Sequence, residues 1–196
     1  MAQEILASSQ SREMNRQTAV NLTLAVRDVP YSLGSDGNTE GLLSEGIGGC
    51  ARKHFYLMPR LQSLGYKVSL GVAKFDWREL PIPKNILSLL KEPVQTHLFL
   101  YFGLDKPKHG LDVTWDKGMK SLGFPVFDWD GYSSTGIVVT PIYGSIRKIN
   151  PLILSIRSLA SSNLQKLLGQ ADKPTPFNDA FNKWLSKVRN QASIKP

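Results

Sequence analysis

The sequence predicts an α+β fold in which a cysteine-bearing helix packs on an antiparallel sheet. Three observations support this class. Apolar residues recur every three or four positions near both ends of the chain and again after Cys50, as on one face of an amphipathic helix. Two segments between these helices, residues 66–76 and 94–104, have the composition of strands. A turn and a third short apolar segment follow the second, which indicates an antiparallel hairpin.

Length and composition favour a single domain over residues 1–196, with a core at about 12–145 and a helical extension at about 150–190. A chain of 196 residues with 41% hydrophobic content can bury about 70% of its unfolded surface. No apolar stretch approaches the roughly 20 residues of a membrane-spanning helix, and the N-terminus does not resemble a signal peptide. We therefore expect a cytoplasmic protein without a membrane span, and its oligomeric state stays open.

Cysteine content and charge narrow the function classes. Cys50 is the only cysteine, which rules out an internal disulfide and a thiolate-rich zinc site, and we predict neither a metal nor a cofactor. Most of the net charge of +8 lies in the C-terminal quarter, because the residues from Arg147 onward hold nine Lys/Arg and two Asp/Glu. Solvated helix faces explain this block better than a nucleic-acid or anionic-lipid site.

The N-terminal third is predicted to contain two helices joined by a loop. Residues 1–10 are small and polar, and we expect them to fray. An amphipathic helix is predicted over about 12–27, where the Val29-Pro30 pair ends it. A glycine-rich surface loop over 31–47 then leads to the helix that begins at Cys50.

The cysteine helix and the sheet follow. Gly65 is the expected cap of this helix, and Pro59 is expected to kink or shorten it near Phe55. The segment 94–104 is apolar on both faces, which is typical of a central strand that is covered on both sides. The other expected elements are a strand at 66–76, a short helix near 86–90, a turn at 106–110, a returning strand at 111–115 and a strand at 136–143.

Two helices are predicted to close the chain. Asn150-Pro151 and Thr175-Pro176 each supply a capping side chain followed by proline at the first helical position. Apolar residues at helical spacing follow each pair, over about 152–168 and 177–188.

Cys50 opens its helix directly after two glycines, and this position favours a reactive thiol. A free thiol has a pKa of about 8.5 and is mostly protonated at neutral pH. The partial positive charge at a helix N-terminus stabilises the thiolate, and the unpaired N–H groups there, including that of Cys50, can stabilise an oxyanion. Gly48 and Gly49 carry no side chain, so we expect them to let a substrate backbone approach closely.

His97 and Asp112 supply a base and an orienting group for this thiol. His97 lies 47 residues after Cys50, and Asp112 lies 15 residues after His97, on successive strand-like segments. We expect His97 to accept the thiol proton or to hold it in an ion pair, and Asp112 to orient the imidazole. Asp116 is the alternative to Asp112, because periodicity does not separate the two. His54, one turn after Cys50, is expected to pack the helix rather than to tune the thiol.

A family resemblance rests on the motifs around these residues. Its segments are Val26–Tyr31, the run Gly48-Gly49-Cys50, and the Leu64-Gly65 pair that ends the helix. With the interval between His97 and Asp112, these segments resemble the transglutaminase-like domain over about residues 15–116. The resemblance implies a papain-like α+β fold with Cys50, His97 and Asp112 as catalytic triad, and it selects Asp112 over Asp116.

The resemblance also implies a chemistry. Members of this family transfer acyl groups through a thioester, in amide cross-linking, deamidation, or the hydrolysis of peptides and amides, so the expected substrate is a protein, a peptide or a small amide. Arylamine N-acetyltransferases have a similar triad and are the second interpretation. The third is a catalytically inactive binding module in which Cys50 is a small buried apolar residue.

Overall fold

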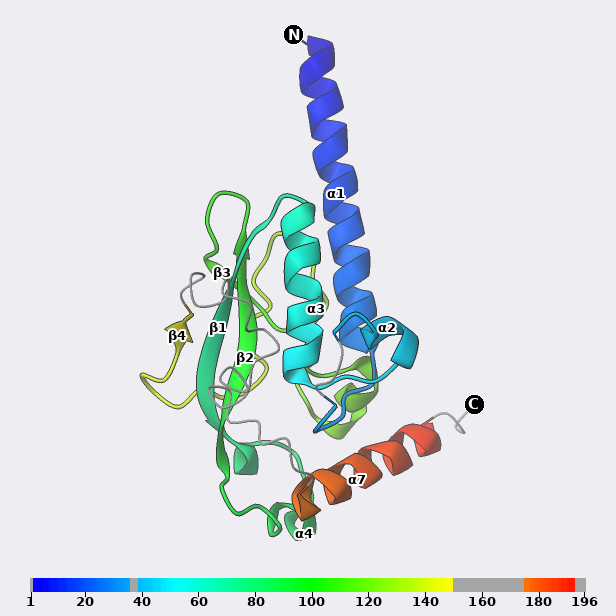
Figure 1. The fold of residues 1–196 in the computed structure, drawn as a ribbon, viewed down its shortest axis with the longest axis vertical. Helices are drawn as coiled ribbons and strands as arrows, with labels where there is room; N and C mark the ends of the chain where they lie inside the picture. Colours follow the sequence, from blue (N-terminus) through cyan, green and yellow to red (C-terminus); the bar gives the residue numbers. More distant parts are fainter. Residues whose placement is uncertain (1, 36–38, 150–174, 193–196) are drawn as a thin grey trace.

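The structure is a computed structural model that describes residues 2–35, 39–149 and 175–192. It confirms the α+β class, because several helices accompany a four-stranded antiparallel sheet (Figure 1). The strand order is β3-β2-β1-β4. The strands are β1 (Lys67–Asp76), β2 (Val94–Gly103), β3 (His109–Leu111) and β4 (Arg147–Lys148).

Helix α1 (Ala2–Asp28) is longer than the sequence pattern predicts. The expectation that residues 1–10 fray is wrong from Ala2 onward, because the helix already includes these residues. Several of them are good helix formers, so the backbone stays helical without an apolar stripe. The helix ends directly before Val29-Pro30, as predicted, and its N-terminal half projects beyond the other elements (Figure 1).

Helix α3 (Cys50–Ser63) begins at the cysteine, as predicted. Gly65 follows the helix with a φ of +93°, a left-handed conformation that favours glycine. Pro59 lies inside the helix and does not shorten it, so that part of the prediction is wrong. The proline lies on the exposed side of the helix, where water can bind the carbonyl of Phe55 that the missing N–H leaves unpaired.

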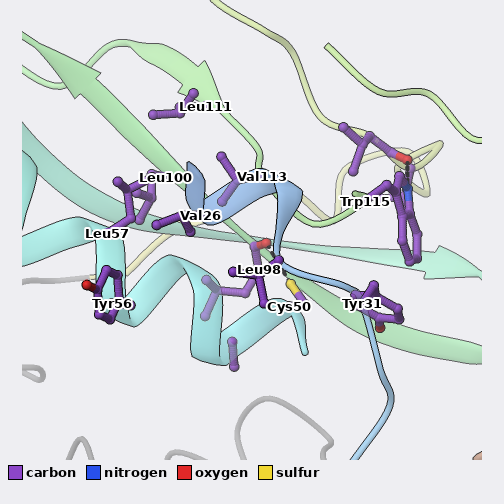
Figure 2. Close-up of a cluster of buried hydrophobic side chains, with 14 of the residues drawn as sticks. Val26, Tyr31, Cys50, Tyr56, Leu57, Leu98, Leu100, Leu111, Val113 and Trp115 are labelled. Atoms are coloured by element: carbon purple, nitrogen blue, oxygen red, sulfur yellow. Dashed lines mark hydrogen bonds between the residues drawn. The ribbon is translucent and has the colours of Figure 1, made fainter. Parts of the chain in front are cut away.

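The core lies between α3 and the central strands β1 and β2. Antiparallel pairing places Leu70 of β1 opposite Leu100 of β2. Leu57 and Leu61 of α3 and both strand leucines are almost completely buried in one apolar cluster. Figure 2 shows the part of this cluster around Leu57 and Leu100. Strand β2 is buried on both faces, as its sequence predicts, since Phe99 on the opposite face is also inaccessible. Helix α1 packs along α3 in a second layer (Figure 1).

Two predicted strands differ from the structure. The returning strand β3 covers only His109–Leu111 instead of 111–115, because the chain leaves the sheet at Asp112 and bonds to side chains of α3. The segment 136–143 is not a strand. Its backbone bonds largely to side chains: Val138 N–H donates to Asp112, and Val138 O accepts from the indole of Trp115.

Short helices occupy the connections. They are α2 (Leu42–Glu45), the 3-10 turn η1 (Trp77–Glu79), α4 (Lys84–Leu87) and the 3-10 helix η2 (Lys117–Leu122). Helix α4 confirms a short helix near the predicted 86–90, shifted toward the N-terminus. Helix α2 lies within the predicted loop 31–47 and buries Leu42 completely.

Helix α7 (Pro176–Ala192) confirms the second C-terminal helix. Its start is as predicted, because Thr175 Oγ1 accepts from the amide of Asn178 at 3.1 Å and Pro176 is the first helical residue. The other predicted helix, at about 152–168, lies outside the described residues. None of the helices in the described part of the chain is long and apolar enough to cross a membrane.

Candidate active site

The structure brings together the three side chains that the sequence singles out. Cys50 is the first residue of α3, His97 lies in β2, and Asp112 directly follows β3. Cys50 Sγ is 3.8 Å from His97 Nδ1. On the other side of the ring, His97 Nε2 is 2.6 Å from Asp112 Oδ2. This is the order that a thiol, a base and an orienting carboxylate require.

The Asp112 carboxylate is buried and held by several donors. Besides His97, it accepts hydrogen bonds from Thr114 N–H at 3.1 Å, from the Thr114 hydroxyl at 2.7 Å and from Val138 N–H at 3.1 Å. Burial raises the pKa of Asp112, but His97 and His54 hold it well below its usual range. The carboxylate is therefore ionised, and its orientation is fixed.

Cys50 and His97 favour the ionised form of each other. Burial raises the pKa of the Cys50 thiol, but His97 and His54 outweigh this effect and lower it to about 5. Burial likewise lowers the pKa of His97, but Asp112 and Cys50 raise it to about 10. A thiolate–imidazolium pair is thus favoured over the pH range between these values. The protonated thiol also has a partner, because Leu98 O lies 3.1 Å from Sγ (Figure 2).

His54 is part of the site, although the sequence pattern assigns it only to helix packing. Its Nδ1 is 3.7 Å from Cys50 Sγ and 2.8 Å from Cys50 O. Its Nε2 accepts from Val113 N–H at 3.2 Å and lies 3.5 Å from Asp112 Oδ1. The spacing of four residues on one helix was the signal for this contact, because side chains at i and i+4 are neighbours.

The charges and the hydrogen bonds around His54 act in opposite directions on its protonation. Burial lowers the pKa of His54, but Asp112 and Cys50 outweigh this effect and raise it to about 9. The Val113 N–H opposes protonation of Nε2, since a protonated nitrogen has no lone pair to accept this bond. Within the described residues, no group of His, Cys, Asp and Glu side chains has an arrangement that could hold a metal ion.

Asp116, the alternative to Asp112, does not contact His97 in the structure and has a separate set of partners. Its carboxylate accepts from Tyr31 N–H at 2.8 Å and from Gly118 N–H at 3.1 Å, and it forms an ion pair with Arg189 of α7. Asp116 therefore caps η2 and joins α7 to the body of the protein. Asp112 is the aspartate that contacts His97.

Gly48 has a structural role that the sequence pattern did not predict. Its N–H donates to Pro30 O at 3.1 Å and is not available to an oxyanion. A Cβ at this position would lie 2.4 Å from Leu42 Cδ1, so any side chain here would displace the buried Leu42. Gly49 is the extended N-cap of α3. Within the described chain no side chain caps this end, and the N–H of Cys50 remains a candidate oxyanion donor.

The thiol and the imidazole face a cavity of about 510 Å³. Helix α7 forms part of its wall through Phe177 and Asn178, a long-range contact that the sequence pattern did not predict. The wall combines aromatic side chains with the polar groups of Gln95 and Thr96 and the charged Lys91 and Glu92. The aromatic lining residues are Tyr31, Phe75, Trp77, Trp115 and Phe177.

Comparisons with known proteins do not place the chain in a family. No family model matches it, and neither a curated protein nor a solved structure is similar enough to count as a match. The chemistry of the site is therefore inferred from its geometry and not from a relative.

Proposed function

We propose that this protein is a cysteine-dependent acyltransferase or amide hydrolase that forms a thioester at Cys50. The observation that carries the proposal is the buried chain of contacts from Cys50 Sγ through the His97 ring to the Asp112 carboxylate, with steps of 3.8 and 2.6 Å. At its Cys50 end, this series of contacts opens to the cavity, because the reacting thiol is part of the cavity wall. A structural cysteine needs neither an imidazole nor an open cavity beside it.

In the first half of the reaction, the Cys50 thiolate attacks the carbonyl carbon of an amide, ester or thioester. A bond forms between Sγ and carbon, and the carbonyl oxygen becomes an oxyanion that the Cys50 N–H at the start of α3 stabilises. His97 then gives its Nδ1 proton to the leaving group as the tetrahedral intermediate collapses. The products are the free amine, alcohol or thiol and a thioester on Cys50.

In the second half, an acceptor enters the cavity and releases the acyl group. His97, now neutral, takes a proton from water or from an amine while that nucleophile attacks the thioester carbonyl. Sγ leaves as the thiolate, and the thiolate–imidazolium pair is restored. Asp112 keeps the ring in position throughout, because its contact is to the opposite nitrogen.

The arrangement of the elements supports a papain-like, transglutaminase-like fold as part of this proposal. The nucleophile lies at the N-terminus of a helix that packs on an antiparallel sheet, and the base lies on a central strand of that sheet. On this basis the substrate is a protein, a peptide or a small amide. The aromatic cavity next to the thiol has room for a bulky acyl group or acceptor.

Intact-protein mass spectrometry tests the proposal. The protein is incubated with an activated acetyl thioester, quenched in acid and weighed, and peptide mapping locates the adduct. We expect one acetyl group on Cys50, and much slower labelling in His97→Ala because the thiolate is lost. The matched control is His109→Ala, which removes the partly exposed histidine of β3. Absence of an adduct on Cys50, or equal labelling of His97→Ala, would contradict the proposal and favour a binding module.

A further inference from the structure

Two adjacent residues of α3, Lys53 and His54, hold the segment that carries Asp112. The Lys53 ammonium donates to Thr114 O at 3.0 Å and to Arg27 O at 2.8 Å. His54 Nε2 accepts from Val113 N–H at 3.2 Å. One helix thus forms hydrogen bonds with the N–H of Val113 and the carbonyl of Thr114, the two residues that follow Asp112.

We propose that Lys53 and His54 are positioning residues that fix the Asp112 carboxylate relative to Cys50. We call this pair the α3 clamp. The inference rests on the proposed function, because it assigns a role within the same site. It adds that the first turn and a half of α3 determines the positions of both the nucleophile and the orienting carboxylate.

Lys53 acts on Asp112 through Thr114. The Thr114 carbonyl is bound by the ammonium, and the N–H and hydroxyl of the same residue both donate to Asp112 Oδ1, at 3.1 and 2.7 Å. The Thr114 hydroxyl also lies 3.5 Å from Cys50 Sγ. Displacement of the Thr114 backbone would therefore remove two of the donors that hold the carboxylate.

His54 holds Val113, the residue between Asp112 and Thr114. Its ring bonds Val113 N–H on one side and Cys50 O on the other, the latter at 2.8 Å. The ring is completely buried and in contact with Cys50 Sγ as well. It therefore links the first turn of α3 to the chain that follows β3, and it sets the separation between the thiol and Asp112.

Simple filling of space does not require these side chains. Lys53 is fully inaccessible to solvent, and burial lowers its pKa to about 7. An apolar side chain of similar length would fill the volume without desolvating an amine. It would, however, leave the Thr114 and Arg27 carbonyls without the donor that now joins them. The hydrogen bonds, rather than the volume, distinguish lysine here.

The first test compares Lys53→Met with Arg52→Met. Both remove a buried cation from the same helix, but Arg52 bonds Glu45 and Ile47 O, far from the Asp112 segment. The readout is the low-field NMR signal of the His97 Nε2 proton. This signal is visible only while the hydrogen bond to Asp112 keeps the exchange of the proton with water slow. We expect both Lys53→Met and Asp112→Asn to lose this signal, and Arg52→Met to keep it.

The second test compares two variants of His54. His54→Gln keeps an acceptor that can reach Val113 N–H, whereas His54→Leu fills the space and removes the acceptor. We expect the glutamine to retain the His97 signal and the leucine to lose it, with the alkylation midpoint of Cys50 raised by about one pH unit or more in the leucine variant. This pair decides the question if Lys53→Met does not fold.

Persistence of the His97 signal in folded Lys53→Met, or in folded His54→Leu, overturns the clamp. So does its equal loss in His54→Gln and His54→Leu, because the acceptor would then be irrelevant. Either result leaves the proposed function intact as long as His97→Ala still slows acylation of Cys50. Failure of acylation in the wild-type protein, in contrast, rejects the proposed function while the His97 signal still reports on the clamp.

Discussion

His97 and Asp112 approach within 2.6 Å although they are not partners in the sheet. The ladder between β2 and β3 runs from the Phe102–His109 pair to the Leu100–Leu111 pair and ends there. The next residue leaves the sheet, and its carboxylate turns toward the imidazole instead of continuing the strand. A strand through 111–115 would have paired Asp112 with a residue near Phe99, because antiparallel partners move in opposite directions. The end of β3 is therefore what places the aspartate at His97.

The two aspartates of this region are predicted to have different effects. Asp112→Asn should slow alkylation of Cys50 at pH 6 by at least about tenfold, because the imidazolium loses its carboxylate. Asp116→Asn should leave that rate within about twofold of the wild type and lower stability, because it weakens the contacts with Arg189 and Tyr31. Iodoacetamide kinetics and urea unfolding measure the two effects. The reverse pattern would assign the orienting role to Asp116.

Gly48 is predicted to matter for packing and not for catalysis. Gly48→Ala should cost about 1–3 kcal/mol of unfolding free energy, because its Cβ would overlap Leu42 Cδ1. The cost should be clearly smaller when measured in a Leu42→Ala background, where the overlapping methyl group is absent. Denaturant unfolding of the double-mutant cycle provides the measurement. An equal cost in both backgrounds would show that the steric explanation is wrong.

Helix α7 is predicted to be an integral part of the fold. Phe181 is fully buried and its ring lies against Tyr31, Trp77 and Phe177, all of which line the cavity. Phe181→Ala should cost about 3–5 kcal/mol. The exposed Phe127 is the matched control, and its alanine variant should stay within about 0.5 kcal/mol of the wild type. If α7 only rests on the surface, the two variants would have similar stabilities.

The acylation rate is predicted to have a bell-shaped dependence on pH. The rate should rise through about pH 5 as the Cys50 thiol loses its proton, and fall through about pH 10 as His97 loses the proton that the leaving group needs. Stopped-flow acylation with an amide or ester of a poor leaving group measures both limbs. A rate that keeps rising up to pH 9, as for a free thiol, would exclude His97 as the acid.

Much of the fold can be predicted from local patterns in the sequence. The start of α3 at Cys50, the strands β1 and β2 and the Thr175-Pro176 start of α7 all depend on residues within a few positions of each other. The errors have a different origin. The apolar pattern of 136–143 is that of a strand, but Val138 is buried because its backbone bonds Asp112 and Trp115, which are distant in sequence.

In the site, too, some residues can be predicted from local sequence patterns, and others depend on contacts that are distant in sequence. Spacing and residue type select Cys50 and His97 but leave Asp112 and Asp116 as alternatives, and the resemblance favours Asp112. The structure shows that Asp112 is the one in contact with His97. Lys53 has no such signal, because a lysine on a helix is ordinarily solvated and only the tertiary fold buries it between α1 and the Asp112 segment. The role of Gly48 is hidden for a similar reason, since Leu42 lies in a segment that the sequence presents as a surface loop.

The protonation state of Cys50 tests the central claim most directly. Iodoacetamide reacts with the thiolate, so the pH dependence of its rate reports the pKa of the thiol without knowledge of the substrate. The wild-type protein should show a midpoint near pH 5, and His97→Ala should move it toward the value of a free cysteine, about 8.5. A wild-type midpoint near 8.5, or the same midpoint in both proteins, would show that Cys50 is not an activated nucleophile.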